Sequence, residues 1–499
     1  MEENGGGLSG GKLAKKEGAS LKPLPGIAQS LAKKFAFEPT PGQLLLFRKM
    51  EAWFADSSSA KPTFILKGYA GTGKTSFLST LISVLPQLKL QLQMMAPTGR
   101  ASKVMSGFTR RISFTIHKRI FRFELDETGY PTLKRQKNSF HKTLFVVDEA
   151  SMVGNQQEYG SKGILEELVR YVFENKGNRL LIIGDTAQLP PVGTDLSLAL
   201  KADEMRMRYG LDVVEHELSD VVRQELDSGI LENATALREV IRGIKPGFIL
   251  KTAGYPDIFK MSANRVFEGI EYAYAKYGME KTLVLTRTNK QAMQYNRGIR
   301  GHILYREEEL ESGDWVIVVK NNYSILDNES KTGFVANGDL CTVRRVGRSL
   351  DDYPLRISSL ELTLSDANDD EEKLDGYAFT ELLYSDLPQL SDEQIRTFQQ
   401  VLMAEWELEE KSIRKRWAKM KTDPVANALQ IKFGYALTCH KSQGGQWDAV
   451  FVDHGFLKEG PLDSEFYRWF YTAITRARKE VFIINPDKRL LEERIEKTD

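Results

Sequence analysis

The chain has 499 residues, which is enough for about two to four domains. Its 41% hydrophobic and 27% charged content is that of an ordinary globular protein. Its net charge is +1, from 69 basic and 68 acidic side chains. The global charge therefore does not indicate nucleic-acid binding, and any nucleic-acid-binding surface must be locally basic.

The two cysteines, Cys341 and Cys439, lie far apart and have no metal-binding spacing, which favours a reducing compartment. No apolar stretch reaches the roughly 18 residues of a membrane span, and the N-terminus lacks the apolar core of a signal peptide. We therefore expect a cytoplasmic protein with no membrane partner.

Residues 1–36 are rich in Gly, Lys and Ala and predict a flexible tail. A helix is expected to open at Thr40-Pro41-Gly42-Gln43, with Thr40 at the N-cap and Pro41 at the first helical position. Gln43 has two interpretations, which can both hold. It can complete a capping box, or its amide can contact the edge of an adenine base.

The apolar run Phe64–Leu66 enters Gly68–Thr75, which has the pattern G-x-x-x-x-G-K-T and precedes apolar residues at helical spacing. Strand, loop and helix come in the order of a P-loop, whose glycines let backbone N–H groups approach a polyphosphate. Lys74 is expected at the β- and γ-phosphates and the Thr75 hydroxyl on Mg²⁺. The residues expected to hold the nucleotide are Gln43, Gly68, Ala70, Gly71, Thr72, Gly73, Lys74, Thr75 and Ser76.

A second strand is expected to end at Pro97, and the polar and small residues after it start a helix. Phe121–Leu125 and Tyr130–Leu133 alternate like strands on either side of Asp126–Gly129, which is a hairpin pattern in basic surroundings. His117 precedes this hairpin on an apolar stretch, where a core histidine is the alternative to a ligand-binding one.

The continuous apolar run Leu144–Val147 is typical of a buried parallel strand and ends in Asp148 and Glu149. After a P-loop, such carboxylates fit a Walker B pair: Asp148 would hold Mg²⁺ through water and Glu149 would polarise the attacking water. Acidic residues at a helix N-cap are the alternative. Gln188 follows the next buried strand, Leu180–Ile183, and is a candidate γ-phosphate sensor.

Apolar strands alternating with helices predict a doubly wound parallel sheet, and a second core of this type follows without its own P-loop. An isolated arginine, Arg223, lies near its start. Short β-strands from about residue 311 predict a small barrel that interrupts this core. A charged helix capped by Ser391 then ends in the basic segment Arg414–Lys419, which either follows phosphates or is simply a solvated helix end.

In this order the segments resemble the motifs of superfamily 1 DNA helicases of the RecD/Dda-like group, over residues 37–485. The similar segments are Gly68–Thr75 (motif I), Ala96–Ser102 (Ia), Asp148–Met152 (II), Gly184–Val192 (III), Leu218–Gln224 (the arginine-finger segment), Thr438–Gly444 (V) and Tyr471–Ala477 (VI). The resemblance implies an α/β fold: two RecA-like P-loop domains of parallel sheets with flanking helices, a β-hairpin insertion in the first and an SH3-like β-barrel insertion in the second.

The resemblance also implies domain limits. After the tail, domain 1A would span 37–200 with the hairpin "pin" 1B at about 118–138. Domain 2A would comprise 201–310 and 426–499. The barrel insertion with its charged helix, 2B, would span 311–425.

The implied activity is ATP-dependent movement on single-stranded DNA, 5′→3′, coupled to duplex unwinding, with ATP and Mg²⁺ as cofactors. The implied catalytic residues are Lys74, Asp148, Glu149, Gln188, Arg223 and Arg476, and the implied metal ligands are Thr75 and Asp148. The implied DNA-binding residues are Thr98, Arg100, His117, Phe121, Phe123, Thr438, His440 and Lys441.

The implied partners are single-stranded DNA and single-strand/duplex junctions, bound by a monomer, with single-stranded-DNA-binding or repair proteins as candidate protein partners. Two alternatives remain: an ATPase that remodels nucleoprotein without unwinding, and the motor subunit of a RecBCD-like nuclease complex. The hairpin tip is polar, so a stacking wedge would have to come from Phe121, Phe123 or Tyr130.

Overall fold

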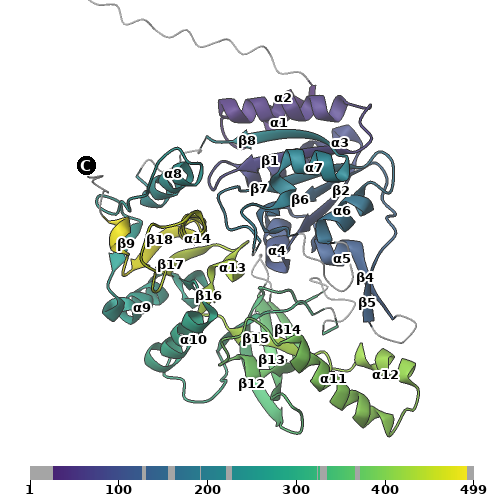
Figure 1. Cartoon of the computed structure of the whole chain (residues 1–499), viewed down its shortest axis with the longest axis vertical. Helices are drawn as coiled ribbons and strands as arrows, with labels where there is room; N and C mark the ends of the chain where they lie inside the picture. Colours follow the sequence, from purple (N-terminus) through teal and green to yellow (C-terminus); the bar gives the residue numbers. More distant parts are fainter. Residues whose placement is uncertain are drawn as a thin grey trace, which may run out of the picture.

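The computed structural model describes residues 26–125, 131–154, 163–191, 193–220, 227–322, 324–325, 334–365 and 371–491 (Figure 1). It contains two parallel sheets and a closed barrel. In the view of Figure 1 the first sheet is uppermost, the second lies to the left and the barrel lies at the bottom. None of the helices within these ranges is both long and apolar enough to cross a membrane. The predicted fold class is confirmed.

The first sheet has six strands in the order β3-β2-β6-β7-β1-β8, all paired in parallel. The strands are β1 (Pro62–Gly68), β2 (Gln91–Ala96), β3 (Ser113–Thr115), β6 (Thr143–Val147), β7 (Arg179–Gly184) and β8 (Asp212–Leu218). Alternate side chains of β1 enter opposite cores: Phe64 and Leu66 on one face, Ile65 on the other. The burial of both faces explains why the central strands β1, β6 and β7 are almost continuously apolar.

Helices cover both faces of this sheet. On one face lie α1 (Gly26–Lys34), α2 (Pro41–Ala55), α3 (Lys74–Leu88) and α4 (Gly99–Thr109). On the other face lie α5 (Ile116–Ile120), α6 (Ile164–Val172) and α7 (Ala202–Tyr209).

Two of the expected limits need correction here. The tail was expected to reach residue 36, but α1 packs on α2 and α3 with Ala28 and Leu31 fully buried. Its apolar residues have helical spacing, which the surrounding lysines and glycines obscured. The first domain was expected to end at residue 200, but β8 pairs with β1 along its whole length, so the first sheet continues to Leu218.

The second sheet has the order β16-β10-β17-β18-β9 and is also parallel. Its strands are β9 (Ile258–Met261), β10 (Thr282–Thr286), β16 (Ala436–Thr438), β17 (Trp447–Asp453) and β18 (Ala477–Ile484). We call the first sheet with its helices the first half of the molecule, and the second sheet with its helices the second half. The helices of the second half are α8 (Gly229–Ile241), α9 (Val266–Tyr277), α10 (Asn289–Gly298), α13 (Cys439–Ser442) and α14 (Ser464–Ile474).

The barrel closes through β11 (Trp315–Val318), β12 (Leu340–Leu350), β13 (Ile357–Ser365), β14 (Glu371–Phe379) and β15 (Leu429–Phe433). The expected limit at residue 425 is therefore too early, because β15 belongs to the barrel. One continuous stretch supplies both β15 and β16, and sequence does not show that it changes sheets at Gly434. The charged helix is two helices, α11 (Asp392–Glu407), with the expected Ser391 capping box, and α12 (Ile413–Met420).

The predicted hairpin is present as β4 (Phe121–Leu125) and β5 (Pro131–Arg135), paired in antiparallel register. It projects away from the first sheet (Figure 1). Its base is fixed by Arg135, whose guanidinium lies 3.2 Å from Glu167 and 2.7 Å from Glu174. The predicted turn, Asp126–Gly129, lies outside the described residues.

Candidate functional site

Two glycines determine the shape of the loop after β1. Gly71 and Gly73 have φ values of 77° and 85°, a left-handed conformation that other residues rarely adopt. A Cβ on Gly73 would also lie 2.7 Å from Nε2 of Gln43. Conformation and space therefore both require glycine, as expected for a loop that presents N–H groups to a polyphosphate.

Lys74 begins α3, and its side chain folds back over the loop. Its Nζ donates to the carbonyl oxygens of Gly68 at 2.6 Å and Tyr69 at 2.8 Å. A phosphate oxygen is a stronger acceptor for an ammonium group than these neutral carbonyls. Thr75 and Ser76 follow in the first turn of α3, where the helix dipole favours an anion.

Gln43 is fully buried and uses both ends of its amide. Its Oε1 accepts from the backbone N–H of Thr40 at 3.0 Å, and the Thr40 side chain accepts from Gln43 N, so the predicted capping box is confirmed. Its Nε2 donates to the carbonyl of Thr72 in the P-loop at 3.1 Å. Gln43 therefore ties α2 to the loop, and contact with adenine stays a prediction.

Asp148 and Glu149 follow β6, where a short turn of helix begins. Asp148 Oδ1 accepts from the Glu149 N–H at 2.8 Å, and Glu149 has a φ of 52°. Burial, then the Glu149 charge, raise the pKa of Asp148 to about 7, while the nearby Lys74 cation acts in the opposite direction. Glu149 makes no side-chain capping bond, so the alternative N-cap role has no support here.

The segment after β7 lies between the two sheets. Asp185 Oδ1 accepts from Ala187 N–H at 2.9 Å, which forms a tight turn. Gln188 is 5% exposed, and its buried Oε1 has no hydrogen-bond partner among the described residues. Leu189 leaves the first sheet and enters the hydrophobic core of the second, together with Tyr69 of the P-loop.

Helix α14 of the second half contacts this segment directly. The Tyr471 hydroxyl accepts from Ala70 N–H at 2.9 Å and donates to Asp185 Oδ2 at 2.8 Å. The Arg468 guanidinium donates to the carbonyl oxygen of Thr186. These contacts were not predicted, because an aromatic residue in an apolar helix is usually read as core. The one available signal was a tyrosine, whose hydroxyl needs a partner when buried.

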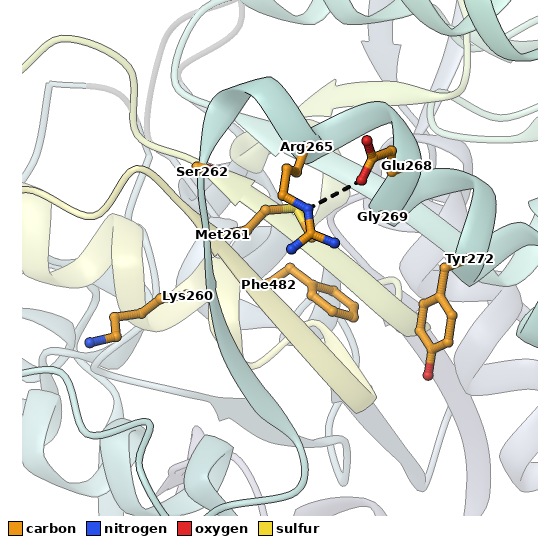
Figure 2. A pocket seen from close by; sticks show the side chains of 8 residues that line it. All are labelled: Lys260, Met261, Ser262, Arg265, Glu268, Gly269, Tyr272 and Phe482. Carbon is orange, nitrogen blue, oxygen red and sulfur yellow. Dashed lines mark hydrogen bonds and ion pairs between the residues drawn. The ribbon is translucent and has the colours of Figure 1, made fainter.

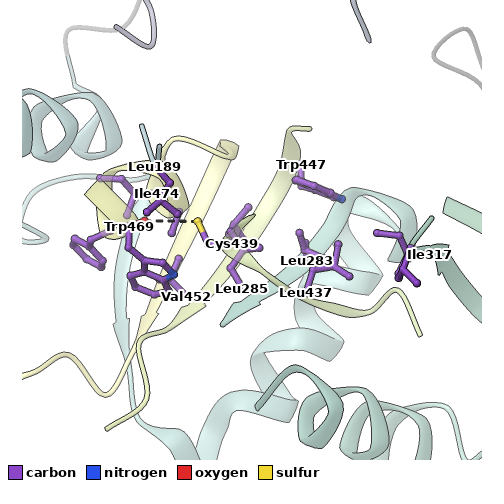
Figure 3. Close-up of a cluster of buried hydrophobic side chains, with 14 of the residues drawn as sticks. Leu189, Leu283, Leu285, Ile317, Leu437, Cys439, Trp447, Val452, Trp469 and Ile474 are labelled. Atoms are coloured by element: carbon purple, nitrogen blue, oxygen red, sulfur yellow. Dashed lines mark hydrogen bonds between the residues drawn. The ribbon is translucent and has the colours of Figure 1, made fainter. Parts of the chain in front are cut away.

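The apolar part of the same interface is shown in Figure 3, where Leu189 lies beside Trp469 and Ile474 of α14. Cys439 Sγ lies 3.7 Å from the carbonyl oxygen of Trp469, which joins α13 to α14. Cys439 is fully buried in this core, and burial raises the pKa of its thiol to about 12.

Of the two arginines predicted to be catalytic, Arg476 and Arg223, the structure describes only Arg476. Arg476 follows α14 and is 4% exposed; it donates to the carbonyl oxygens of Thr472 at 3.2 Å and Gly445 at 3.3 Å. No hydrogen bond between described residues joins it to the P-loop, which on this side is contacted by Tyr471 instead. Arg223 lies outside the described residues.

The first-half residues Thr98, Arg100 and His117, which were predicted to bind DNA, lie at α4 and α5. Thr98 caps α4 by accepting from Ala101 N–H at 3.2 Å. Arg100 stacks on Trp447 of the second sheet at 4.2 Å, and burial lowers its pKa to about 10. Its Nη1 is buried without a partner among the described residues. Arg100 therefore contributes to the contact between the two halves.

His117 and Phe121 lie together, with ring centroids 5.9 Å apart. His117 is partly exposed, whereas Phe121 is 8% exposed and belongs to a core of the first sheet. The expectation that Phe121 stacks on a base is therefore wrong, because its ring is occupied by packing. The side chain of Phe123 lies outside the described residues.

Thr438, His440 and Lys441 lie at α13, beside the barrel. Thr438 is 7% exposed at the helix N-cap, and His440 is exposed. Lys441 Nζ donates to the carbonyl oxygen of Pro388 at 2.9 Å. Burial, then the neighbouring Lys432 cation, lower the pKa of Lys441 to about 7.

A separate cavity of about 410 Å³ lies between β9 and α9 (Figure 2). It is lined by Lys260, Met261, Ser262, Arg265, Glu268, Gly269, Tyr272 and Phe482. It contains none of the predicted site residues, and β9 is at the opposite edge of the second sheet from β16 and α13.

Two protein families match the chain: an AAA domain over residues 52–244 and a UvrD-like helicase C-terminal domain over residues 433–484. The chain is 24% identical to the ATP-dependent RecD2 DNA helicase of Deinococcus radiodurans, over 87% of this chain and 48% of that protein. It is also 24% identical to the uncharacterized protein R530 of Acanthamoeba polyphaga mimivirus, over 84% of this chain and 94% of that protein.

Among solved structures, the Bacteroides Pif1 helicase in complex with ADP-AlF3 and single-stranded DNA is 17% identical, with a TM-score of 0.47 over 89% of this chain and 93% of that one. The two domain matches coincide with the first sheet and with the C-terminal strands of the second. They support the resemblance that the motifs indicate, to nucleotide-using ATP hydrolases of the superfamily 1 RecD-like helicase type.

Proposed function

We propose that the protein is an ATP-dependent DNA helicase that moves along single-stranded DNA in the 5′→3′ direction and couples ATP hydrolysis to duplex unwinding. The observation that carries this proposal is the contact between the two sheets at the P-loop. Helix α14, which precedes Arg476, is hydrogen-bonded to Ala70 and Asp185 of the first half. An ATP site placed there has one wall on each sheet, so hydrolysis can change their separation.

Several features of the first half fit a nucleotide and Mg²⁺. Gly68 and Gly73 of the P-loop leave no room for a Cβ, Gln188 Oε1 is buried and unpaired within the described residues, and Asp148 carries a raised pKa that a cation would lower. Thr75 and Asp148 would hold Mg²⁺. Two protein ligands are enough, because Mg²⁺ bound to a nucleotide takes most of its other ligands from phosphates and water. When bound, Mg²⁺ neutralises charge on the phosphates.

The chain's own groups then have separate tasks. Lys74 leaves the loop carbonyls for the β- and γ-phosphates, Glu149 orients the attacking water, and Gln188 senses the γ-phosphate. Arg476 and Arg223 stabilise charge on the transferred phosphoryl group. For Arg476 this requires exchange of its two carbonyl acceptors for phosphate oxygens, which are stronger acceptors for a guanidinium, when the nucleotide binds.

DNA is assigned to the side where both sheets meet the barrel. Thr98 adjoins Gly99, which approaches Ala336, and His117 adjoins Lys118, which lies over the Phe334 ring. Thr438, His440 and Lys441 lie at α13, where Lys441 bonds to the Pro388 carbonyl. A strand that crosses both halves would be moved by each cycle of opening and closing. The β4–β5 hairpin would separate the duplex at a single-strand/duplex junction, and the protein would act as a monomer.

The main alternative is an ATPase that moves on single-stranded DNA and remodels nucleoprotein without unwinding. The burial of Phe121 favours it, because that ring is not available as a wedge. A motor subunit of a nuclease complex would use the same ATP site and differ in its partners.

Strand separation tests the proposal most sharply. The full chain, ATP and Mg²⁺ are mixed with duplexes that carry either a 5′ or a 3′ single-stranded tail, and release of the labelled strand is followed. We expect release from the 5′-tailed duplex alone. Release from the 3′-tailed duplex alone would reject the polarity, and release from neither, with DNA-dependent ATP turnover, would select the remodelling alternative.

A further inference from the structure

Tyr471 is a fully buried tyrosine whose hydroxyl connects two segments of the other half of the molecule. It accepts from Ala70 N–H of the P-loop and donates to Asp185 Oδ2 after β7. Burial raises the pKa of Tyr471 well above its usual value, so the group stays a neutral hydroxyl that can make both bonds.

The P-loop is thereby held from two sides. Gln43 of α2 bonds to Thr72 from within the first half. Tyr471 bonds to Ala70 from the second half. The first contact moves with the first sheet, and the second depends on where α14 lies. The conformation of the loop at Ala70 is therefore sensitive to the relative position of the two halves.

The segment that carries Gln188 is held in the same way. Leu189 N–H donates to Thr472 Oγ1 at 2.9 Å, and its carbonyl accepts from Gln443 Nε2 at 2.9 Å. Asp185, at the start of the segment, bonds to Tyr471. Both ends of Asp185–Leu189 are thus fixed by the second half, and Gln188, whose Oε1 has no partner in the part of the chain that the structure describes, lies between them.

We propose that Tyr471 is a positioning residue that sets the P-loop and the Gln188 segment for hydrolysis only when the two halves are closed. The inference rests on the proposed ATPase function and deepens it. In the closed arrangement the Tyr471 hydroxyl bonds to both the Ala70 N–H and the Asp185 carboxylate. In an open arrangement both groups would be hydrated instead. Because Tyr471 touches neither nucleotide nor DNA in this role, it transmits the domain position and takes no part in the chemical step.

The test is Tyr471→Phe in the full chain, with Tyr435→Phe as a matched control. Tyr435 makes the same two kinds of bond, accepting from Trp315 N–H at 3.0 Å and donating to Asp314 Oδ1 at 2.8 Å. It is 2% exposed and packs in a different core cluster. The two variants therefore lose equivalent buried hydrogen bonds, one pair at the ATP site and one pair away from it.

For Tyr471→Phe we expect kcat for ATP with saturating single-stranded DNA to fall about 10- to 100-fold, because a buried N–H and a buried carboxylate lose their common partner. KM for ATP should change less than about threefold, since Gln43 still fixes the part of the loop that binds phosphate. ATP turnover without DNA should change little. Tyr435→Phe should lower the thermal unfolding midpoint similarly and leave kcat within about twofold.

Equal kcat values for Tyr471→Phe and the wild type, or equal losses in both variants, would overturn the inference. A wild type without ATP turnover would instead refute the proposed function, which separates the two failures. Should Tyr471→Phe fail to fold, Asp185→Asn keeps the volume and removes the carboxylate that Tyr471 donates to. It should lower DNA-stimulated kcat in the same way, and an unchanged kcat there would also count against the inference.

Discussion

Two of the contacts between the first half and the rest of the molecule differ in chemistry. At the ATP side the contact consists of hydrogen bonds around the buried Tyr471 hydroxyl, with Ala70 and Asp185, and of apolar packing around Leu189. Towards the barrel it consists of charged side chains. Lys103 pairs with Asp339 at 2.6 Å, and Lys118 lies over the Phe334 ring at 4.4 Å.

The difference indicates what each contact is suited for. Buried hydrogen bonds have strict geometry and small dependence on salt, so they can report the position of one half to the other. Lysine side chains are screened by salt and bind phosphates readily, so a nucleic-acid backbone can compete for them. The barrel also approaches closely: a Cβ on Gly99 would lie 1.8 Å from the Cβ of Ala336.

The largest effect is expected for Lys74→Ala. The variant loses a cation that binds ATP and stabilises its transition state, so kcat/KM for ATP should fall by about 10³-fold or more. Lys67→Ala is the matched control, because Lys67 lies just before the loop and pairs with Glu215 on the surface. It should stay within about twofold of the wild type. Retained turnover in Lys74→Ala would show that the P-loop assignment is wrong.

The second largest effect is expected for Arg476→Ala, which should lower kcat about 10³-fold and change ATP affinity little. Arg468→Ala is its comparison, since that guanidinium bonds to the Thr186 carbonyl in the same interface. We expect about a tenfold loss for Arg468→Ala, from a loosened contact. Single-turnover kinetics measure both. The reverse order would make Arg468 the arginine that acts on phosphate.

At the charged contact, Lys103→Met should change DNA binding and spare ATP binding. It removes the ion pair with Asp339, which keeps its bond from Ala336 N–H at 2.7 Å. The dissociation rate of a labelled single-stranded oligonucleotide should rise about three- to tenfold, with KM for ATP unchanged. Lys251→Met, which breaks a surface pair with Glu232, is the control. Equal dissociation rates in both variants would show that the contact with the barrel does not take part in DNA binding.

The smallest effect concerns Lys441, whose pKa is lowered to about 7. Unfolded Lys titrates near 10.5, so between about pH 7 and 10.5 the unfolded chain binds more protons and folding stability rises with pH. Below pH 7 the buried cation costs stability in full. Lys441→Met lacks this cost, so it should unfold about 2–4 °C higher than the wild type near pH 6, and this advantage should shrink above about pH 7 and vanish near pH 10.5. A difference independent of pH would contradict the burial of this charge.

Local signals explain what sequence predicted well. Gly71 and Gly73 have backbone conformations that demand glycine, and Asp148 ends a strand whose apolar run is unbroken. The capping box at Gln43 is a four-residue pattern. Each of these depends on neighbours in the chain, so each can be inferred from a short segment.

Long-range contacts explain what sequence missed. Tyr471 and Ala70 are 401 positions apart, and nothing near either residue indicates that they meet. The stretch that supplies β15 and β16 has no strong break in its β pattern, so only the structure shows that it passes from the barrel to the second sheet. Phe121 alternates with polar residues in the hairpin strand, and only the structure shows that the core of the first sheet occupies its ring.

The central claim is that the second half completes the ATP site and that DNA controls this completion. Steady-state ATP turnover by the full chain, measured with and without single-stranded DNA, tests it most directly. We expect DNA to raise kcat by at least about tenfold, because bound DNA would favour the closed arrangement in which Tyr471 joins Ala70 to Asp185. Turnover that is the same with and without DNA would contradict the claim.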